Sequence, residues 1–324
     1  MKKILLSLFS LPILFAQGQK LVNTFHIASG GGWDYIAVNG GSLYVSHGTQ
    51  VNILDKMTGD SLGVIPNTTG VHGIAFDVAQ GKGYTSNGRL NNVTVFDLTT
   101  NAILGQIPTG TNPDAIMYEP FTKTIITCNG RSNDLSIIDV AGQKVVATIP
   151  VGGKPETAVT DNAGKLFVNI EDKNEIAVID LTTKTVTAHW SLAPGEGPSG
   201  LAIDPATKRL FSTCDKSLVV VDATNGKVVA RIPIGDGTDG VVFDNATKMI
   251  YPSNGEGNIT AIKETGADKY TVAATIPTAK GARTITIDAS THTLYLPTAE
   301  FEANTPKGQR PKMIPGTFKV LVVH

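Results

Sequence analysis

Residues 115–150 read AIMYEPFTKTIITCNGRSNDLSIIDVAGQKVVATIP, and this stretch carries the pattern that decides the fold. It holds four short apolar runs, at Ala115–Tyr118, Thr124–Cys128, Leu135–Asp139 and Lys144–Ile149, which are rich in Val, Ile and Thr. Clusters of Gly, Asn, Asp, Pro and Lys separate the runs, and no segment between them has the length of a helix. Short runs of this kind, bounded by turn-forming residues, predict four antiparallel strands.

The four-strand unit recurs about every 42 residues. Its marker is an Ile-Pro pair at the end of the fourth run, and the intervals between successive pairs are 42, 42, 83 and 44 residues. The double interval contains one more copy, with Ser191-Leu192 in place of the pair. Four strands at this period are typical of a β-propeller blade, with the Pro blunting its outer edge. The pairs are Ile65-Pro66, Ile107-Pro108, Ile149-Pro150, Ile232-Pro233 and Ile276-Pro277.

Seven copies of the first strand predict an all-β, seven-bladed propeller of four-stranded antiparallel blades. The last copy has only three strands, at 284–288, 293–296 and 317–323. Lys20–His26 matches Lys227–Pro233 position for position, so we expect this N-terminal strand to complete the last blade and close the ring. The first strands lie at Tyr35, Gly73, Ala115, Thr157, Gly200, Gly240 and Thr284.

The first 18 residues have the pattern of a bacterial Sec-type signal peptide. Two lysines in residues 1–3 precede an apolar run, Ile4–Ala16, and the small residues Ala16 and Gly18 fit cleavage after one of them. The run is too short to span a bilayer. We therefore expect a mature chain of residues 19–324, a single periplasmic or secreted propeller domain without a transmembrane segment.

Charge and cysteine usage restrict the partners and the cross-links. Removal of Lys2 and Lys3 changes the formal net charge from −1 to −3, which gives no general attraction for a polyanion. Cys128 and Cys214 are the only cysteines, and they fall in the third and fifth repeats. Because a disulfide needs Cα atoms within about 7 Å, we expect two free, buried thiols.

In such a ring, the loops that enter the first strand and the loops between the second and third strands lie on one face. Acidic residues that recur on the opposite face, such as Asp97, precede hairpin turns, and we interpret them as structural because Asp side chains order such turns. On the first face, the residues before each first strand should surround the mouth of the axial channel. They are Asp34, His72, Asp114, Glu156, Ser199, Asp239 and Arg283.

The ends of the second strands should form another ring just outside this one. His47 lies in it, together with Asn87, Asn129 and Asn254, and Arg89 and Arg131 follow Asn-Gly pairs nearby. Polar groups on the loops of a rigid ring suit a ligand site. The candidate ligand-binding residues are Asp34, His47, His72, Arg89, Asp114, Arg131, Glu156, Asp239 and Arg283.

The sequence predicts no cofactor by motif, and a Cys-x-x-Cys-His haem attachment signal is absent. A divalent cation is the cofactor that the ring would suit, because His72, Asp114, Glu156 and Asp239 offer nitrogen and oxygen ligands. Such an ion would polarise an ester or activate water. Against this, Arg283 in the same ring would repel a cation, and the acids and bases could pair with each other.

The seventh repeat inserts Ala299–Gly316 between its second and third strands. This segment contains three prolines and the cations Lys307, Arg310 and Lys312. A loop of this length on the variable face is typical of a lid or a partner-binding flap, although a rigid cap over the closing seam explains it equally well.

Three segments carry a family resemblance: Tyr44-Val45-Ser46-His47, Tyr84-Thr85-Ser86-Asn87 and Tyr251-Pro252-Ser253-Asn254. With the Val-x-Ile/Phe-Asp strands and the Ile-Pro endings, they resemble the repeats of YVTN-repeat propellers. The likeness covers the whole mature chain, which is similar to YncE-like periplasmic proteins. The resemblance implies export and seven blades, and it raises single-stranded DNA binding as a function.

The leading hypothesis is a monomeric, exported binding module of the cell envelope that recognises a small molecule, a peptide or an envelope protein at the channel mouth. A metal-assisted hydrolase or lyase acting there on a lactone-like substrate is the alternative, so enzymatic activity stays open. Nucleic-acid binding is a third hypothesis, and the acidic residues among Arg89, Arg131 and Arg283 oppose it.

Overall fold

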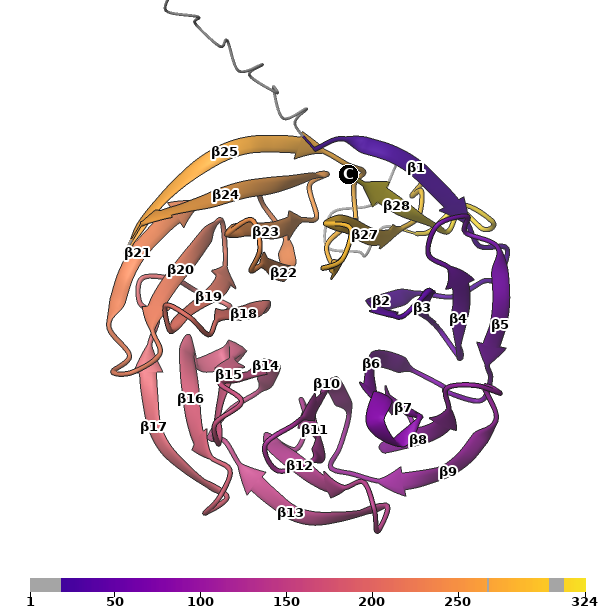
Figure 1. Ribbon diagram of the computed structural model, residues 1–324, viewed down its shortest axis with the longest axis horizontal. Helices are drawn as coiled ribbons and strands as arrows, with labels where there is room; N and C mark the ends of the chain where they lie inside the picture. The colour runs from indigo at the N-terminus through magenta and orange to yellow at the C-terminus, as the bar shows by residue number, and fades with distance from the viewer. Residues whose placement is uncertain (1–18, 267, 303–311) are drawn as a thin grey trace, which may run out of the picture.

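The computed structural model describes residues 19–266, 268–302 and 312–324, and it confirms the all-β, seven-bladed propeller (Figure 1). Each blade is a sheet of four antiparallel strands, and the innermost strands surround a common axis. The predicted signal peptide lies outside the described residues. Within the described ranges, no helix has the length and apolar character needed to cross a membrane.

Blades 1 to 3 follow one another along the chain. From the axis outward, their strands are β2 (Trp33–Asn39), β3 (Ser42–His47), β4 (Gln50–Asp55) and β5 (Ser61–Ile65); β6 (Val71–Asp77), β7 (Lys82–Asn87), β8 (Asn92–Asp97) and β9 (Ile103–Pro108); and β10 (Pro113–Glu119), β11 (Thr124–Asn129), β12 (Asp134–Asp139) and β13 (Lys144–Pro150). Two single-turn 3₁₀ helices occur in loops, η1 (Val78–Gln80) and η2 (Glu171–Lys173).

Blades 4 to 6 repeat the arrangement, and blade 7 combines the two ends of the described chain. Their strands are β14 (Pro155–Thr160), β15 (Lys165–Ile170), β16 (Glu175–Asp180) and β17 (Thr185–Ser191); β18 (Leu201–Asp204), β19 (Arg209–Cys214), β20 (Ser217–Asp222) and β21 (Val228–Pro233); β22 (Thr238–Asp244), β23 (Met249–Asn254), β24 (Asn258–Gly266) and β25 (Lys269–Pro277); and β26 (Thr286–Asp288), β27 (Thr293–Thr298), β28 (Lys319–Val323) and β1 (Leu21–His26).

The closing strand pairs as the sequence predicts. β1 lies antiparallel to β28, with Phe25 opposite Val320 and His26 opposite Lys319. The Ile27 N–H extends this ladder by donating to the Phe318 carbonyl at 3.0 Å. The N-terminal strand therefore becomes the outer strand of blade 7, and the ring has no unpaired gap between its first and last blades.

The hydrophobic core is divided into seven clusters, one in each interface between neighbouring blades. Because side chains alternate along a strand, each blade sends one set of apolar residues to the preceding blade and the other set to the following blade. Phe25, Leu43 and Val320, for example, meet between blades 7 and 1. This packing explains why the strands are near-continuous apolar runs.

Turn-forming residues on the face opposite the mouth are structural, as expected. The Asp97 carboxylate accepts hydrogen bonds from the N–H groups of Thr99 and Thr100 at 2.9 and 2.8 Å, and Asp55 does the same for Met57 and Thr58. These bonds hold the pKa of Asp97 below its usual value. The recurrent carboxylates on this face therefore fix hairpins.

Two contacts fasten the seam between blades 7 and 1 on that face. The Lys56 Nζ lies 2.6 Å from an Asp288 oxygen, and the Tyr295 hydroxyl donates to the Lys56 carbonyl at 3.0 Å. Lys56 belongs to blade 1, whereas Asp288 and Tyr295 belong to blade 7. The seam is thus joined by an ion pair and a hydrogen bond in addition to the β1–β28 ladder.

The innermost strands of blades 1 to 4 and 6 begin two residues earlier than expected, and blade 7 differs in the other direction. Its innermost strand starts at Thr286, two residues later than expected, and β28 starts at Lys319 instead of residue 317. The two ends of the insertion pair through Phe301 and Met313, while residues 303–311, with Lys307 and Arg310, lie outside the described residues. Both cysteines are buried and unbridged, as expected.

Phe25→Ala is expected to loosen the ring at its closing blade. Phe25 is 4% exposed in the cluster between blades 7 and 1, so its truncation should cost about 3–5 kcal/mol of unfolding free energy. Amide hydrogen exchange should accelerate most in β1 and β28. The matched control is Phe211→Ala, a fully buried residue between blades 5 and 6, which should accelerate exchange there instead. Unchanged protection of β1 in the Phe25 variant would contradict this account of closure.

Lys56→Met is expected to lower the melting temperature by a few degrees at pH 7. Burial raises the pKa of Asp288, but hydrogen bonds from Lys56 and Ser290 outweigh it, so the folded pKa lies below that of the unfolded chain. The stabilisation is therefore present above about pH 4 and is lost as the pH falls. Melting curves from pH 7 to pH 3 should show the difference between variant and wild type shrink. Lys312→Met, which removes an exposed pair with Glu302, should have little effect at any pH.

Candidate functional site at the channel mouth

The seven residues predicted to surround the axis do meet there, five of them as the second residue of an innermost strand and Ser199 and Arg283 just before one, and six of the seven form a chain of polar contacts. The Arg283 Nε donates to Asp239 Oδ2 at 2.6 Å, and the Ser199 hydroxyl donates to Asp239 Oδ1 at 2.5 Å. The Arg283 Nη2 lies 3.9 Å from Asp34 Oδ1. These contacts link blades 5, 6, 7 and 1 across the mouth.

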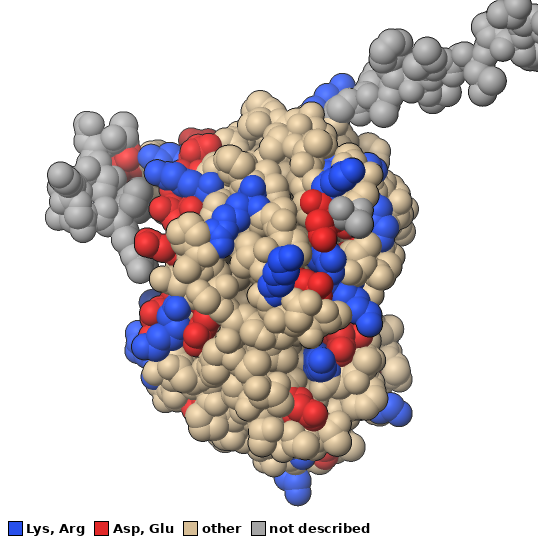
Figure 2. Space-filling model, turned by 90° about the vertical axis from the view of Figure 1, so that its left-hand side faces the viewer, with Lys and Arg blue, Asp and Glu red and all other residues tan. Residues whose placement is uncertain are grey.

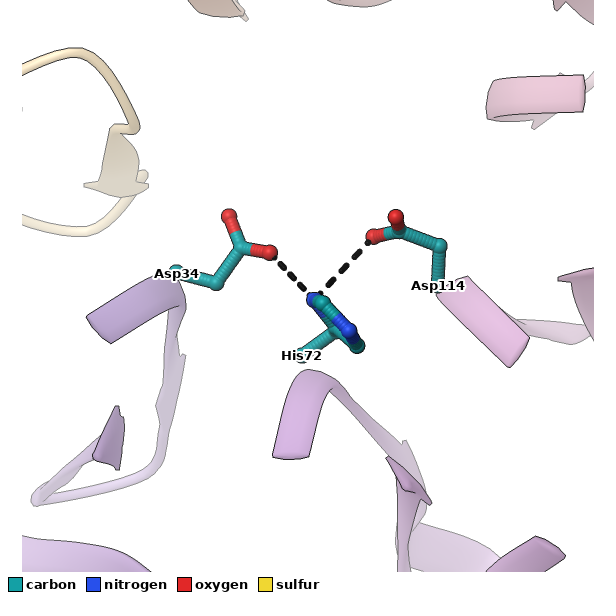
Figure 3. A group of neighbouring side chains, drawn as sticks. All are labelled: Asp34, His72 and Asp114. Atoms are coloured by element: carbon teal, nitrogen blue, oxygen red, sulfur yellow. Dashed lines mark hydrogen bonds and ion pairs between the residues drawn. The ribbon is translucent and has the colours of Figure 1, made fainter. Parts of the chain in front are cut away.

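The chain continues through His72 in blade 2 (Figure 3). The His72 Nδ1 lies 2.6 Å from Asp34 Oδ2 and 3.6 Å from Asp114 Oδ1, and both carboxylates point at the imidazole. Glu156 in blade 4 pairs with Lys154 instead, at 2.5 Å. The structure therefore places Asp34, His72 and Asp114 in one group, while Glu156 and Asp239 belong to separate ion pairs with Lys154 and Arg283.

Hydroxyl groups from the second strands hold the backbone of the ring in place. The Ser86 Oγ accepts from the Gly73 N–H at 2.8 Å and donates to the Asp114 carbonyl of the next blade. Ser253 donates in the same way to the Arg283 carbonyl. Ser86 and Ser253 are the third residues of the Tyr-x-Ser-Asn segments, and they connect two ring residues, Asp114 and Arg283, to the preceding blade. The sequence did not predict this role.

Burial and mutual repulsion perturb the carboxyl groups of the mouth. Burial and then the negative charge of Asp34 raise the pKa of Asp114 to about 7. Burial and the charge of Asp114 raise the pKa of Glu156 to about 8, despite the neighbouring Lys154. Burial lowers the pKa of His72, but the Asp34 hydrogen bond and the nearby carboxylates outweigh it, so the pKa is raised. The mouth is therefore a site that favours positive charge.

A mainly apolar cavity of about 150 Å³ lies between the innermost strands of blades 1 to 4. Its wall includes the residues that follow four ring members along the chain: Tyr35, Gly73, Ala115 and Thr157. Cys128 and Ala158 complete one side of it. The cavity therefore lies next to the charged ring along the same innermost strands.

Two polar groups of the cavity wall have unusual surroundings. The Tyr35 side chain of blade 1 packs against the cluster between blades 3 and 4, and burial, then the charges of Asp114 and Asp34, raise its pKa well above the usual value. The Thr157 hydroxyl is buried and has no hydrogen-bond partner among the described residues. An unpaired donor of this kind is costly, which marks the cavity as a place where a ligand or water would be held.

The second ring is structural. Asn87, Asn129 and Asn254 are fully buried, and each amide donates within its own hairpin, as in the 2.8 Å bond from Asn87 to Thr94. His47 is also fully buried: it bonds to Ser29 at 2.6 Å and to the Gly31 carbonyl at 2.9 Å. Its ring stacks on Phe318 at a centroid distance of 3.9 Å. His47 therefore offers no exposed surface to a ligand.

The remaining candidates lie outside the group. Arg89 and Arg131 are exposed, and neither forms a hydrogen bond or an ion pair with another described side chain. Phe301, from the base of the insertion, packs on Trp33 of blade 1 at a centroid distance of 5.9 Å. The described ends of the insertion thus cover the seam between blades 7 and 1 beside the mouth. On the rim around β17, β21 and β25, basic and acidic side chains are interspersed (Figure 2).

No protein-family model matches the chain, and a search of curated proteins finds no match. Among solved structures, hydrazine synthase of Kuenenia stuttgartiensis superposes with a TM-score of 0.74 at 17% identity, over 84% of this chain and 94% of that one. The RRP9 WD40 repeats superpose with a TM-score of 0.76 at 10% identity, over 94% of this chain and 97% of that one. The chain has a WD40-like propeller fold. At these identities the likeness concerns the fold alone.

Thr157→Val is expected to raise the unfolding free energy by about 1 kcal/mol, because it replaces a buried, unpaired hydroxyl by a methyl group. Chemical denaturation of the purified domain measures the change. The matched control lies on the same strand: the Thr160 hydroxyl lies 3.1 Å from a Glu119 carboxylate oxygen and 3.2 Å from the Lys165 carbonyl oxygen, so it has an acceptor. Thr160→Val should therefore lower stability by about 1–3 kcal/mol. A loss in the Thr157 variant would mean that its hydroxyl has a partner in solution.

Proposed function

We propose that this protein is an exported binding module that takes a small molecule at the mouth of its axial channel. One observation carries the proposal: the polar group of Asp34, His72 and Asp114 is followed along the same strands by Tyr35, Gly73 and Ala115, which line an apolar cavity. A ligand with a polar group and a compact apolar body would satisfy both environments at once. The signal-peptide pattern of residues 1–18 supports an envelope location.

The cavity limits the size of that ligand. A cavity of about 150 Å³ lined by apolar side chains is large enough to hold a benzene-sized ring. The Thr157 hydroxyl would give such a ligand one hydrogen bond at depth, and the ring residues would contact its polar group at the entrance. We infer a small cyclic or branched molecule with an oxygen or nitrogen substituent, rather than a polymer.

A metal-assisted hydrolase or lyase is the second candidate, and it draws support from the convergence of Asp34, His72 and Asp114. Single-stranded DNA binding has less support. Arg283 forms an ion pair with Asp239 at 2.6 Å, and Lys154 forms one with Glu156 at 2.5 Å. Their charges are therefore largely balanced by carboxylates and would attract phosphates weakly.

Ligand binding is tested through Cys128, which lines the cavity and whose pKa is raised by burial and by Asp114. In a Cys214→Ala background, a thiol reagent reports on Cys128 alone. A panel of small aromatic alcohols, lactones, sugars, nucleotides and short peptides is added to residues 19–324. A true ligand should raise the melting temperature and slow the labelling of Cys128 several-fold, because it occupies the space beside the thiol.

Ala158→Leu tests the location of the site, because the larger side chain would fill the cavity. This variant should abolish the ligand-induced shift, while Ala230→Leu on the outer strand β21 should retain it. The proposal fails if a compound stabilises both variants equally, or if no compound in the panel protects Cys128.

A further inference from the structure

We infer that Asp34, His72 and Asp114 bind one divalent transition-metal ion at the channel mouth. The inference deepens the proposed function and rests on the same site, because the ion would be the group that a polar substituent of the bound molecule contacts. Each residue comes from the corresponding position of three successive blades, so one repeat register supplies all three ligand groups.

The spacing of the donor atoms suits a single ion. One donor atom from each residue lies within 4.8 Å of the other two, and the His72 Nδ1 is 2.6 and 3.6 Å from the two carboxylates. Ligand atoms bound to one zinc ion at about 2.0–2.2 Å lie roughly 3–3.5 Å apart, so only small rotations of the side chains are needed. Figure 3 shows both carboxylates already directed at the imidazole nitrogen.

The hydrogen bonding of the group is incomplete without an ion. The His72 Nδ1 serves one carboxylate, Asp34, and at 3.6 Å Asp114 is beyond hydrogen-bonding distance. The Asp114 carboxylate has a side-chain exposure of 16% and accepts no hydrogen bond from any described residue. A half-buried carboxylate in this state lacks a donor, and a cation between the two acids would replace it.

The donor types narrow the identity of the ion. An imidazole with two carboxylates is typical of sites for zinc, manganese and non-haem iron, whereas calcium and magnesium prefer oxygen ligands alone. The other acids of the mouth have partners, Asp239 in Arg283 and Glu156 in Lys154; Arg283 also lies 3.9 Å from Asp34 Oδ1, which leaves Asp34 Oδ2, the oxygen beside His72, for the ion. The three protein ligands leave coordination positions open towards the channel, where an oxygen of the ligand would bind.

Two other acid–histidine pairs provide an internal comparison. His292 lies 2.7 Å from Asp244 on the opposite face, and His189 lies 2.7 Å from Glu175 on the loop side of blade 4. In both, a single carboxylate serves the imidazole. Only the channel mouth brings two carboxylates to one imidazole among the described residues, so the other pairs serve as controls with similar geometry and no expected ion.

The test is titration of chelator-treated residues 19–324 with Zn²⁺ and with Co²⁺, followed by calorimetry and by the visible absorption of the cobalt protein. We expect one ion per chain. Asp114→Asn, which keeps the shape of the side chain, and His72→Ala should each weaken binding at least tenfold. His292→Ala should leave it unchanged, and melting curves check that all variants are folded.

Binding of less than one ion per chain, or equal affinity in the wild type and the Asp114 variant, would overturn the metal site. An equal loss in the His292 variant would do the same. The two proposals can fail independently. If an organic ligand protects Cys128 in the metal-free protein, the protein binds small molecules at this site without contacting an ion. Stoichiometric ion binding without any protecting compound would keep the metal site and reject the small-molecule module.

Discussion

The structure depends on the burial of both faces of every blade against a neighbouring blade. Each sheet is apolar on two sides, and each side belongs to one of the seven clusters between blades. An isolated blade would expose both apolar faces to water, and a terminal blade of an open array would expose one. Closure of the ring is what buries every face. The pairing of β1 with β28 and the contact of Phe25 with blade 1 follow from this requirement, because they bury the last free side of blade 7.

The same ring geometry creates the mouth. The innermost strands enter the ring from the same face, and side chains at or near their starts must share a small space around the axis. Acids and bases from successive blades therefore contact each other although about forty residues separate them along the chain, as with Asp34 and His72. Arg283 contacts both Asp239 and Asp34, Lys154 contacts both Glu156 and Glu171, and the carboxylates of Asp34 and Asp114 lie beside His72. Burial strengthens these interactions because little water screens them.

The sequence predicted the fold well and the site in part. The period of the Ile-Pro pairs and the match of Lys20–His26 to an outer strand were enough for seven blades and their closure, because both reflect local strand and edge chemistry. The repeat register also located the ring residues. The repeat register did not predict which ring residues pair, because pairing depends on the directions of the side chains around the axis. Glu156 forms an ion pair with Lys154, and Asp34 pairs with His72. In the sequence, His47 and the asparagines at the ends of the second strands resembled exposed polar loop residues. In the structure they are buried, and their hydrogen bonds stabilise the local backbone and hairpins.

The position of β28 has a consequence for how the chain acquires its structure. This strand lies between β27 and β1, so the first strand of the domain finds its partner only after the last strand has been synthesised. Until then β1 has no hydrogen-bonding partner, and the apolar surface of blade 1 that packs against blade 7 remains exposed to solvent. A chain that folds as it grows from its N-terminus therefore keeps this edge of β1 unpaired until residues 319–323 have been made.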